Sequence, residues 1–266
     1  MTQTIGFVGA GPIGTTLARL SVAAGLNVIM SNSRGPETLA DLVAELGPQA
    51  RAATAAQAAA DSDIVVIAVP LNAYDQLDPE IFVGKIVVDT MNYYLEREGR
   101  IPVLDADELT SSELVQQHLR GARIVKALNN LDYFRLGANA RPKGDPERST
   151  LPVAGDDTDA KAQVVAFMDE IGYDAIDVGG LADSWRSSPG MPIYVNAYIA
   201  SPPENLNTPE QKRSWFLDTP GAVVTKEKAE TLLAQAVRGQ AGGIFVPGYI
   251  YPPPTDWISD TVGRRN

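Results

Sequence analysis

Residues 4–14 read TIGFVGAGPIG and decide the fold. The apolar run at residues 4–8 predicts a buried strand, and Gly9, Gly11 and Gly14 follow it with the spacing G-x-G-x-x-G. A stretch with helical character comes directly afterwards. Strand, glycine turn and helix in this order are typical of the opening of a fold that binds a dinucleotide.

The three glycines have separate tasks in such a turn. Gly9 allows the tight turn, Gly11 lets the backbone approach the pyrophosphate, and Gly14 lets the helix pack closely on the strand. The free N–H groups and the positive dipole end of the helix favour the phosphates. The residues that we predict to bind the dinucleotide here are Gly9, Gly11, Pro12, Ile13 and Gly14.

The end of the second predicted strand indicates which dinucleotide binds. A fold specific for NAD places an acidic residue there to bind the ribose 2′-hydroxyl, and this chain has no carboxylate before Glu37. Arginine binds phosphate through paired, charge-assisted hydrogen bonds. The alternative is that Arg34 is an ordinary exposed residue of a loop. We predict NADP(H), with its 2′-phosphate held by Ser31, Asn32, Ser33 and Arg34.

Length and composition exclude several classes of protein. A chain of 266 residues, 44% hydrophobic and 21% charged, is typical of a globular protein with one large domain or a domain with an appendage. The net charge of −11 disfavours nucleic acid and anionic membranes as partners. The absence of cysteine excludes disulfides and thiolate catalysis. With no membrane-length apolar run and no signal peptide, the expected location is the cytoplasm.

Helices and apolar strands alternate as far as about residue 180. The strands are apolar on both faces, as strands of a parallel sheet covered by helices are. This pattern predicts a doubly wound parallel sheet, the Rossmann NAD(P)-binding fold, as a domain of residues 1–180. Its later strands are expected at residues 63–69, 85–89, 122–128, 151–155 and 173–178.

The composition changes in residues 181–266, which we call the C-terminal arm. The arm is rich in proline and aromatic residues, and only residues 226–237 predict a clear helix. A disordered tail seldom carries so many aromatic residues. We therefore predict an irregular arm that packs on another surface, either across its own active site or against the partner in a homodimer.

Several blocks of the sequence together resemble the NADP oxidoreductases that depend on the deazaflavin coenzyme F420. The resemblance spans roughly residues 4–186, and the succession of blocks is more specific than any one of them. It implies hydride transfer between NADP(H) and a small-molecule redox acceptor, for which coenzyme F420 is the candidate. The blocks are residues 9–14, 33–34, 64–70, 89–92, 126–129, 153–157 and 177–181.

Ligands of open parallel sheets bind beyond the carboxyl ends of the strands, near the point where the strand order reverses. We expect Val69, Pro70 and Leu71 to line the nicotinamide side. The amide of Asn92 is predicted to orient the carboxamide of the cofactor or the acceptor. Lys126 is a candidate electrostatic partner of a substrate carbonyl, or a strand residue whose amine reaches the rim.

Three functions remain open. The first is an NADP(H)-dependent oxidoreductase with a planar acceptor such as F420. The second is an NADPH-dependent reductase of a small carbonyl or imine, which needs a proton donor such as Tyr93, Tyr94, Tyr133 or Lys126. The third is a non-catalytic NADP(H)-binding protein whose arm serves a partner. The single histidine, His118, is expected to be a solvated surface residue.

Overall fold

The computed structural model describes residues 2–239, 241 and 242. Within them the sheet has the strand order β3-β2-β1-β4-β5-β6-β7-β8. The strands are β1 (Thr4–Val8), β2 (Asn27–Ser31), β3 (Ala50–Ala52), β4 (Ile64–Ile67), β5 (Ile86–Asp89), β6 (Arg123–Lys126), β7 (Thr150–Gly155) and β8 (Asp174–Asp177).

The connections between strands are mostly helical. The α-helices before the arm are α1 (Pro12–Ala23), α2 (Ala40–Leu46), α3 (Ala55–Ala60), α4 (Leu95–Glu98), α5 (Pro102–Asp105), α6 (Ser111–His118), α7 (Tyr133–Ala138) and α8 (Thr158–Glu170). Short 3-10 helices are η1 (Pro36–Leu39), η2 (Leu71–Gln76), η3 (Pro79–Phe82), η4 (Leu181–Ser187) and η5 (Val195–Tyr198). Thr54 and Thr110 begin α3 and α6 with capping boxes, which explains why these helices start where they do.

Both faces of the sheet are buried, as the apolar strands predict. In β4, Ile64 and Val66 belong to one hydrophobic core, and Val65 and Ile67 belong to the other. Helices α1, α7 and α8 contribute to the first core, and α3 and α6 to the second. The predicted doubly wound sheet is therefore confirmed, with the reversal of strand order between β1 and β4.

One pairing departs from the predicted parallel sheet: β6 and β7 run antiparallel, while every other neighbouring pair in the described sheet is parallel. The helix between them, α7, has 6 residues, about 9 Å of helix. A helix this short does not return the chain to the amino end of the sheet. Apolar strands look the same in parallel and mixed sheets, so the sequence pattern did not show this reversal.

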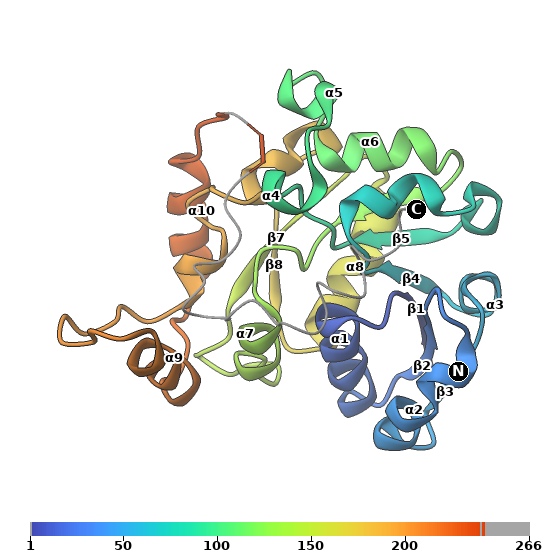
Figure 1. Ribbon diagram of the computed structural model, residues 1–266, viewed down its shortest axis with the longest axis horizontal. Helices are drawn as coiled ribbons and strands as arrows, with labels where there is room; N and C mark the ends of the chain where they lie inside the picture. Colours follow the sequence, from blue (N-terminus) through green and yellow to red (C-terminus); the bar gives the residue numbers. More distant parts are fainter. Residues whose placement is uncertain (1, 240, 243–266) are drawn as a thin grey trace.

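The described part of the C-terminal arm is more regular than predicted. It contains α9 (Pro209–Asp218), which we did not predict, and α10 (Lys226–Ala234), which ends before the expected residue 237. Thr208 and Gln211 form a capping box at the start of α9. Both helices lie at the opposite side of the molecule from α2 and α3 (Figure 1). Residues 240 and 243–266 of the arm lie outside the described residues.

The surface on which this part of the arm packs is its own chain. Tyr198, Val224 and Ala229 are fully buried in the core that α1 and α8 also form. The predicted homodimer stays a prediction, because no second chain is needed to bury these residues. No helix among the described residues has the length and apolar character that crossing a bilayer requires.

Candidate functional site

The glycine turn between β1 and α1 has the geometry that each glycine predicts. Gly9 has φ +113°, and a Cβ there would lie 2.3 Å from the carbonyl oxygen of Ala68. A Cβ at Gly14 would lie 2.2 Å from the carbonyl oxygen of Gly9. A Cβ at Gly11 would meet no atom within 4 Å. Two glycines therefore serve close backbone packing, and the third leaves open space in front of α1.

That open space lies at the N-terminus of α1. Gly11 is the N-cap, so no side chain caps the helix, and Pro12 occupies the first turn, where no acidic residue stands. Gly11 and Pro12 are exposed, and Ile13 is half-buried. Unpaired N–H groups at the positive end of a helix dipole form an anion site, as phosphate binding requires.

The four residues that we predicted to hold a 2′-phosphate, at the end of β2 and in the loop after it, differ in their exposure to solvent. Ser31 is fully buried and its hydroxyl donates to the carbonyl oxygen of Phe7 at 2.7 Å, so its predicted contact with the phosphate stays a prediction that these observations do not favour. The Asn32 side chain orders the loop, because it accepts from the Arg34 backbone N–H at 3.0 Å. Ser33 and Arg34 are exposed. Among the described residues Arg34 forms no ion pair.

The three residues expected on the nicotinamide side also differ in their exposure to solvent. Val69 and Pro70, after β4, are half-buried beside the glycine turn, and a Cβ at Gly9 would lie 3.1 Å from the Val69 side chain. Leu71 is fully buried in the second core, so its predicted contact with the nicotinamide stays a prediction that its burial does not favour. Since η2 begins at Leu71, this side chain turns into the protein as the chain leaves the sheet edge.

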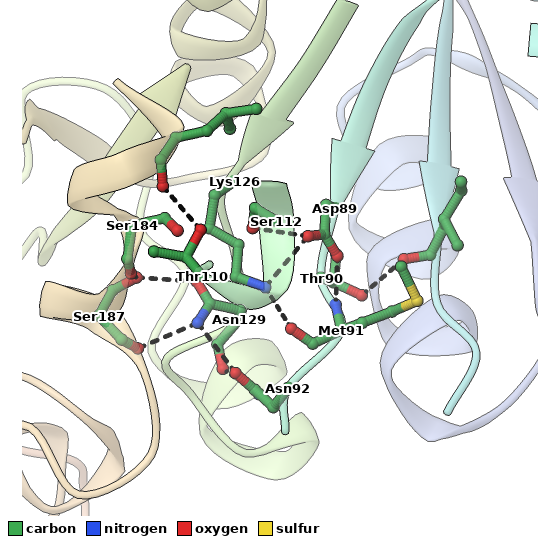
Figure 2. Close-up of polar contacts among 12 residues, drawn as sticks. Asp89, Thr90, Met91, Asn92, Thr110, Ser112, Lys126, Asn129, Ser184 and Ser187 are labelled. Carbon is green, nitrogen blue, oxygen red and sulfur yellow. Dashed lines mark hydrogen bonds and ion pairs between the residues drawn. The ribbon is translucent and has the colours of Figure 1, made fainter. Parts of the chain in front are cut away.

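Lys126 occupies neither of its two predicted positions. Its side chain is 1% exposed, and Nζ lies 3.3 Å from Oδ2 of the fully buried Asp89 (Figure 2). Nζ also donates to the Met91 carbonyl oxygen. Burial lowers the pKa of Lys126, and the Asp89 carboxylate opposes that shift. The ammonium therefore contacts the protein interior and does not reach the rim.

The side chain of Asn92 is also hydrogen-bonded within the protein. Its Oδ1 accepts from Asn129 Nδ2 at 3.0 Å, and its Nδ2 donates to the Asn129 carbonyl oxygen at 2.8 Å. Asn129 Nδ2 also donates to the carbonyl oxygen of Ser187 in η4 at 3.0 Å (Figure 2). The predicted role of the Asn92 amide, orienting the cofactor or the acceptor, stays a prediction. The amide joins β5, β6 and the arm.

The tyrosines that could donate a proton differ in access. The Tyr93 hydroxyl donates to Asp105 at 2.8 Å and accepts from Ile101 N–H. The buried Tyr94 hydroxyl is hydrogen-bonded to the hydroxyl of Tyr194 in the arm. Tyr133 is 38% exposed at the start of α7, and partial burial raises its pKa. Of the candidate proton donors, Tyr133 is the exposed one.

Four buried tyrosines make the fold sensitive to alkaline pH. Burial raises the pKa of Tyr94, Tyr173, Tyr194 and Tyr198 above the ordinary 10.0. The folded chain holds these protons more tightly than the unfolded chain, so their stabilising contribution is complete below pH 10.0 and decreases as the pH rises further. Lys126, with a lowered pKa, has the opposite effect. We expect a lower urea midpoint at about pH 11 than at about pH 8, and equal midpoints would contradict this.

Sequence analysis missed residues that attach the arm. Arg135 is 1% exposed, donates to the Thr219 carbonyl oxygen at 2.8 Å and lies 4.3 Å from the Phe216 ring centroid. His118, expected to be solvated, is half-buried and hydrogen-bonded to the Leu77 carbonyl oxygen at 2.7 Å. Within the described residues no cluster of three or more His, Asp or Glu side chains could hold a metal ion.

Comparison with known proteins agrees with this geometry. Residues 4–93 match the family described as NADP oxidoreductase, coenzyme F420-dependent. The crystal structure of a hypothetical protein from Sinorhizobium meliloti is 32% identical, with a TM-score of 0.64; the match covers 73% of this chain and 93% of that one. No curated protein matches the chain.

Two more distant structures share the fold. A candidate F420-dependent NADP-reductase from Arthrobacter sp. FB24 is 24% identical, with a TM-score of 0.57; the match covers 68% of this chain and 86% of that one. An imine reductase from Pseudomonas sp. is 17% identical, with a TM-score of 0.50 and coverage of 69% and 58%. At these identities the likeness shows the shared fold alone.

Proposed function

The chain belongs to the family of coenzyme F420-dependent NADP oxidoreductases, and we propose that it transfers hydride between NADP(H) and a planar acceptor of the deazaflavin type. NADPH gives a hydride to the acceptor ring, solvent supplies one proton, and NADP+ and the reduced acceptor result. The nicotinamide supplies this chemistry, and the protein holds the two rings face to face and excludes water.

The observation that carries the proposal is the edge of the sheet formed by the glycine turn and the loop after β2. Gly11 leaves the N-terminus of α1 open for the pyrophosphate. Arg34 stands exposed after β2, in a loop ordered by Asn32, where an acidic residue would select NAD. Val69 and Pro70 lie between this edge and β5, which suits a nicotinamide ring.

The planar acceptor is supported by the family and by the name of the Arthrobacter relative. A planar acceptor is also favoured by the candidate proton donors, most of which form hydrogen bonds within the protein. A carbonyl or imine reductase needs a proton donor at the substrate, and Lys126, Tyr93 and Tyr94 are all held inside the protein. Tyr133 remains the candidate donor for that second function.

The test is to mix the purified protein with NADPH and follow nicotinamide absorbance with coenzyme F420, and separately with a panel of carbonyls and imines. Bleaching of the deazaflavin band together with NADPH oxidation supports the proposal. Oxidation with a carbonyl or imine alone, abolished by Tyr133→Phe, would replace it with the second function. Tight NADPH binding without turnover would indicate a non-catalytic NADP(H)-binding protein.

Arg34→Ala is expected to lower the preference for NADPH over NADH by about 10- to 100-fold, because charge-assisted hydrogen bonds to the 2′-phosphate contribute about 1.5–3 kcal/mol. Affinity for NADH should hardly change, since NADH lacks that phosphate. Titration calorimetry with both cofactors measures this. Arg51→Ala is the matched control: Arg51 is an exposed arginine on neighbouring β3 that pairs with Asp61 at 2.5 Å. Equal affinity of the unmutated protein for both cofactors would contradict the NADP(H) assignment.

A further inference from the structure

The turn after β5 is held at both backbone polar groups of one residue, Met91. The Met91 N–H donates to Asp89 Oδ1 at 2.8 Å, and the Met91 carbonyl oxygen accepts from Lys126 Nζ (Figure 2). Asp89 Oδ2 accepts from Ser112 Oγ at 2.8 Å and lies 3.3 Å from Lys126 Nζ. The two members of one ion pair therefore bind the two consecutive peptide groups on either side of the Met91 Cα.

Both members of the ion pair are buried, and stability alone does not explain a buried ion pair. Asp89 is 0% and Lys126 1% exposed. A well-packed apolar pair is often as stable as a buried ion pair, because removing two charges from water offsets their attraction. What an apolar pair cannot do is bind the Met91 carbonyl oxygen. The geometry of the turn is therefore the property that distinguishes Lys126 from an apolar residue of similar length.

This turn connects the end of β4 with the arm. Thr90 Oγ1 donates to the Ile67 carbonyl oxygen at 2.9 Å, where β4 ends before the predicted nicotinamide side. On the other side, the amide groups of Asn92 and Asn129 pair, and Asn129 Nδ2 donates to the Ser187 carbonyl oxygen at 3.0 Å. A shift of the turn would therefore displace the end of β4 and the start of the arm relative to each other.

We propose that Lys126 is a positioning residue: it holds the turn of residues 89–92 so that the nicotinamide side of the sheet and the arm segment of residues 184–194 keep the spacing that hydride transfer needs. This rests on the proposed function. The ammonium does not touch the cofactor or the acceptor. It acts through the Met91 carbonyl oxygen and the Asn92–Asn129 amide pair.

The test separates positioning from stability with two variants. Lys126→Met leaves Asp89 buried and unpaired, and is expected to destabilise the fold. Asp89→Asn combined with Lys126→Met removes both charges, and the new amide oxygen can still accept from the Met91 N–H. The double variant should therefore recover most of the thermal midpoint that the single variant loses, while the Met91 carbonyl oxygen still lacks its ammonium donor.

In the double variant we expect kcat to fall about tenfold or more, because small displacements of reacting groups are costly, with the KM for NADPH within about twofold. Backbone amides of residues 91–95 and 187–195 should exchange with deuterium faster than in the unmutated protein. Lys85→Met is the matched control: Lys85 Nζ also donates to backbone carbonyl oxygens, of Ala60 at 2.8 Å and Ser62 at 3.2 Å, but at the amino end of β5. That variant should change neither kcat nor exchange in these two segments.

A double variant that recovers both its thermal midpoint and its kcat would overturn the proposal, as would unchanged exchange in both segments. If the unmutated protein oxidises NADPH with none of the acceptors, the proposed function fails. The exchange measurement, which needs no acceptor, then decides whether Lys126 holds the turn and the arm together.

Discussion

Gly11→Val is expected to weaken NADPH binding by about 100-fold or more while leaving the thermal midpoint of the protein unchanged. The backbone at Gly11 has φ −76° and ψ −177°, which valine adopts readily, and a Cβ there meets no atom within 4 Å. The fold therefore tolerates the side chain. The pyrophosphate does not, because the added methyl groups occupy the space through which it reaches the N–H groups of α1. Losing two charge-assisted hydrogen bonds of about 1.5–3 kcal/mol each accounts for the effect.

The matched control is Gly14→Val on the same turn of chain. Its Cβ would lie 2.2 Å from the Gly9 carbonyl oxygen, so backbone must move before the side chain fits. This variant should lower the thermal midpoint, and Gly11→Val should not. Calorimetric titration with NADPH and thermal unfolding of both variants give the two measurements. Binding by Gly11→Val with unchanged affinity would mean that the turn has only a structural role.

The glycine turn could be predicted because its rules are local. The conformation of Gly9, the close approach at Gly14 and the open helix end at Gly11 depend on a few neighbouring atoms, and the spacing of the glycines encodes them. The alternation of buried strands and helices is also carried by short segments. These features can be predicted because each depends on the types of residues in one short segment.

The polar residues at the strand ends could not be placed in the same way. Whether Lys126 reaches solvent depends on what packs at the end of β6. There Asn129 is hydrogen-bonded to Ser187 of η4, from a distant part of the sequence (Figure 2). One signal was available: Asp89 and Lys126 each end an apolar strand, and the structure pairs them directly in register. Opposite charges at equivalent ends of neighbouring strands favour an ion pair over two separate ligand contacts.

In the arm, too, local features could be predicted from the sequence, and contacts between distant segments could not. Thr208, Pro209 and Gln211 form a helix start, a capping box with proline in the first turn, that a closer inspection of the sequence could have found. The attachment of the arm could not be predicted. It depends on Asn130 and Arg135 of the Rossmann domain, whose partners lie more than 60 residues further along the chain.

Tyr198→Ala is expected to lower the free energy of unfolding by about 3–5 kcal/mol, the usual cost of deleting a large buried aromatic side chain. Tyr198 is fully buried where the arm meets the sheet. Its hydroxyl accepts from Asn130 Nδ2 at 3.0 Å and donates to the Thr150 carbonyl oxygen at 2.9 Å. Tyr198→Phe should cost about 1–3 kcal/mol, because it leaves these two buried groups without that partner.

Urea unfolding of the two variants measures the cost, and Leu217→Ala is the control. Leu217 is 39% exposed on α9, so its truncation should change the free energy of unfolding by no more than about 0.5 kcal/mol. NADPH affinity should stay within about twofold in all three folded variants, since the glycine turn shares no partner with Tyr198. Light scattering on the same samples tests the predicted homodimer. An unchanged free energy of unfolding in Tyr198→Ala would mean that the arm is a loosely attached tail. A loss that grows as the protein is diluted would instead indicate that a second chain helps to hold the arm, because only association depends on concentration.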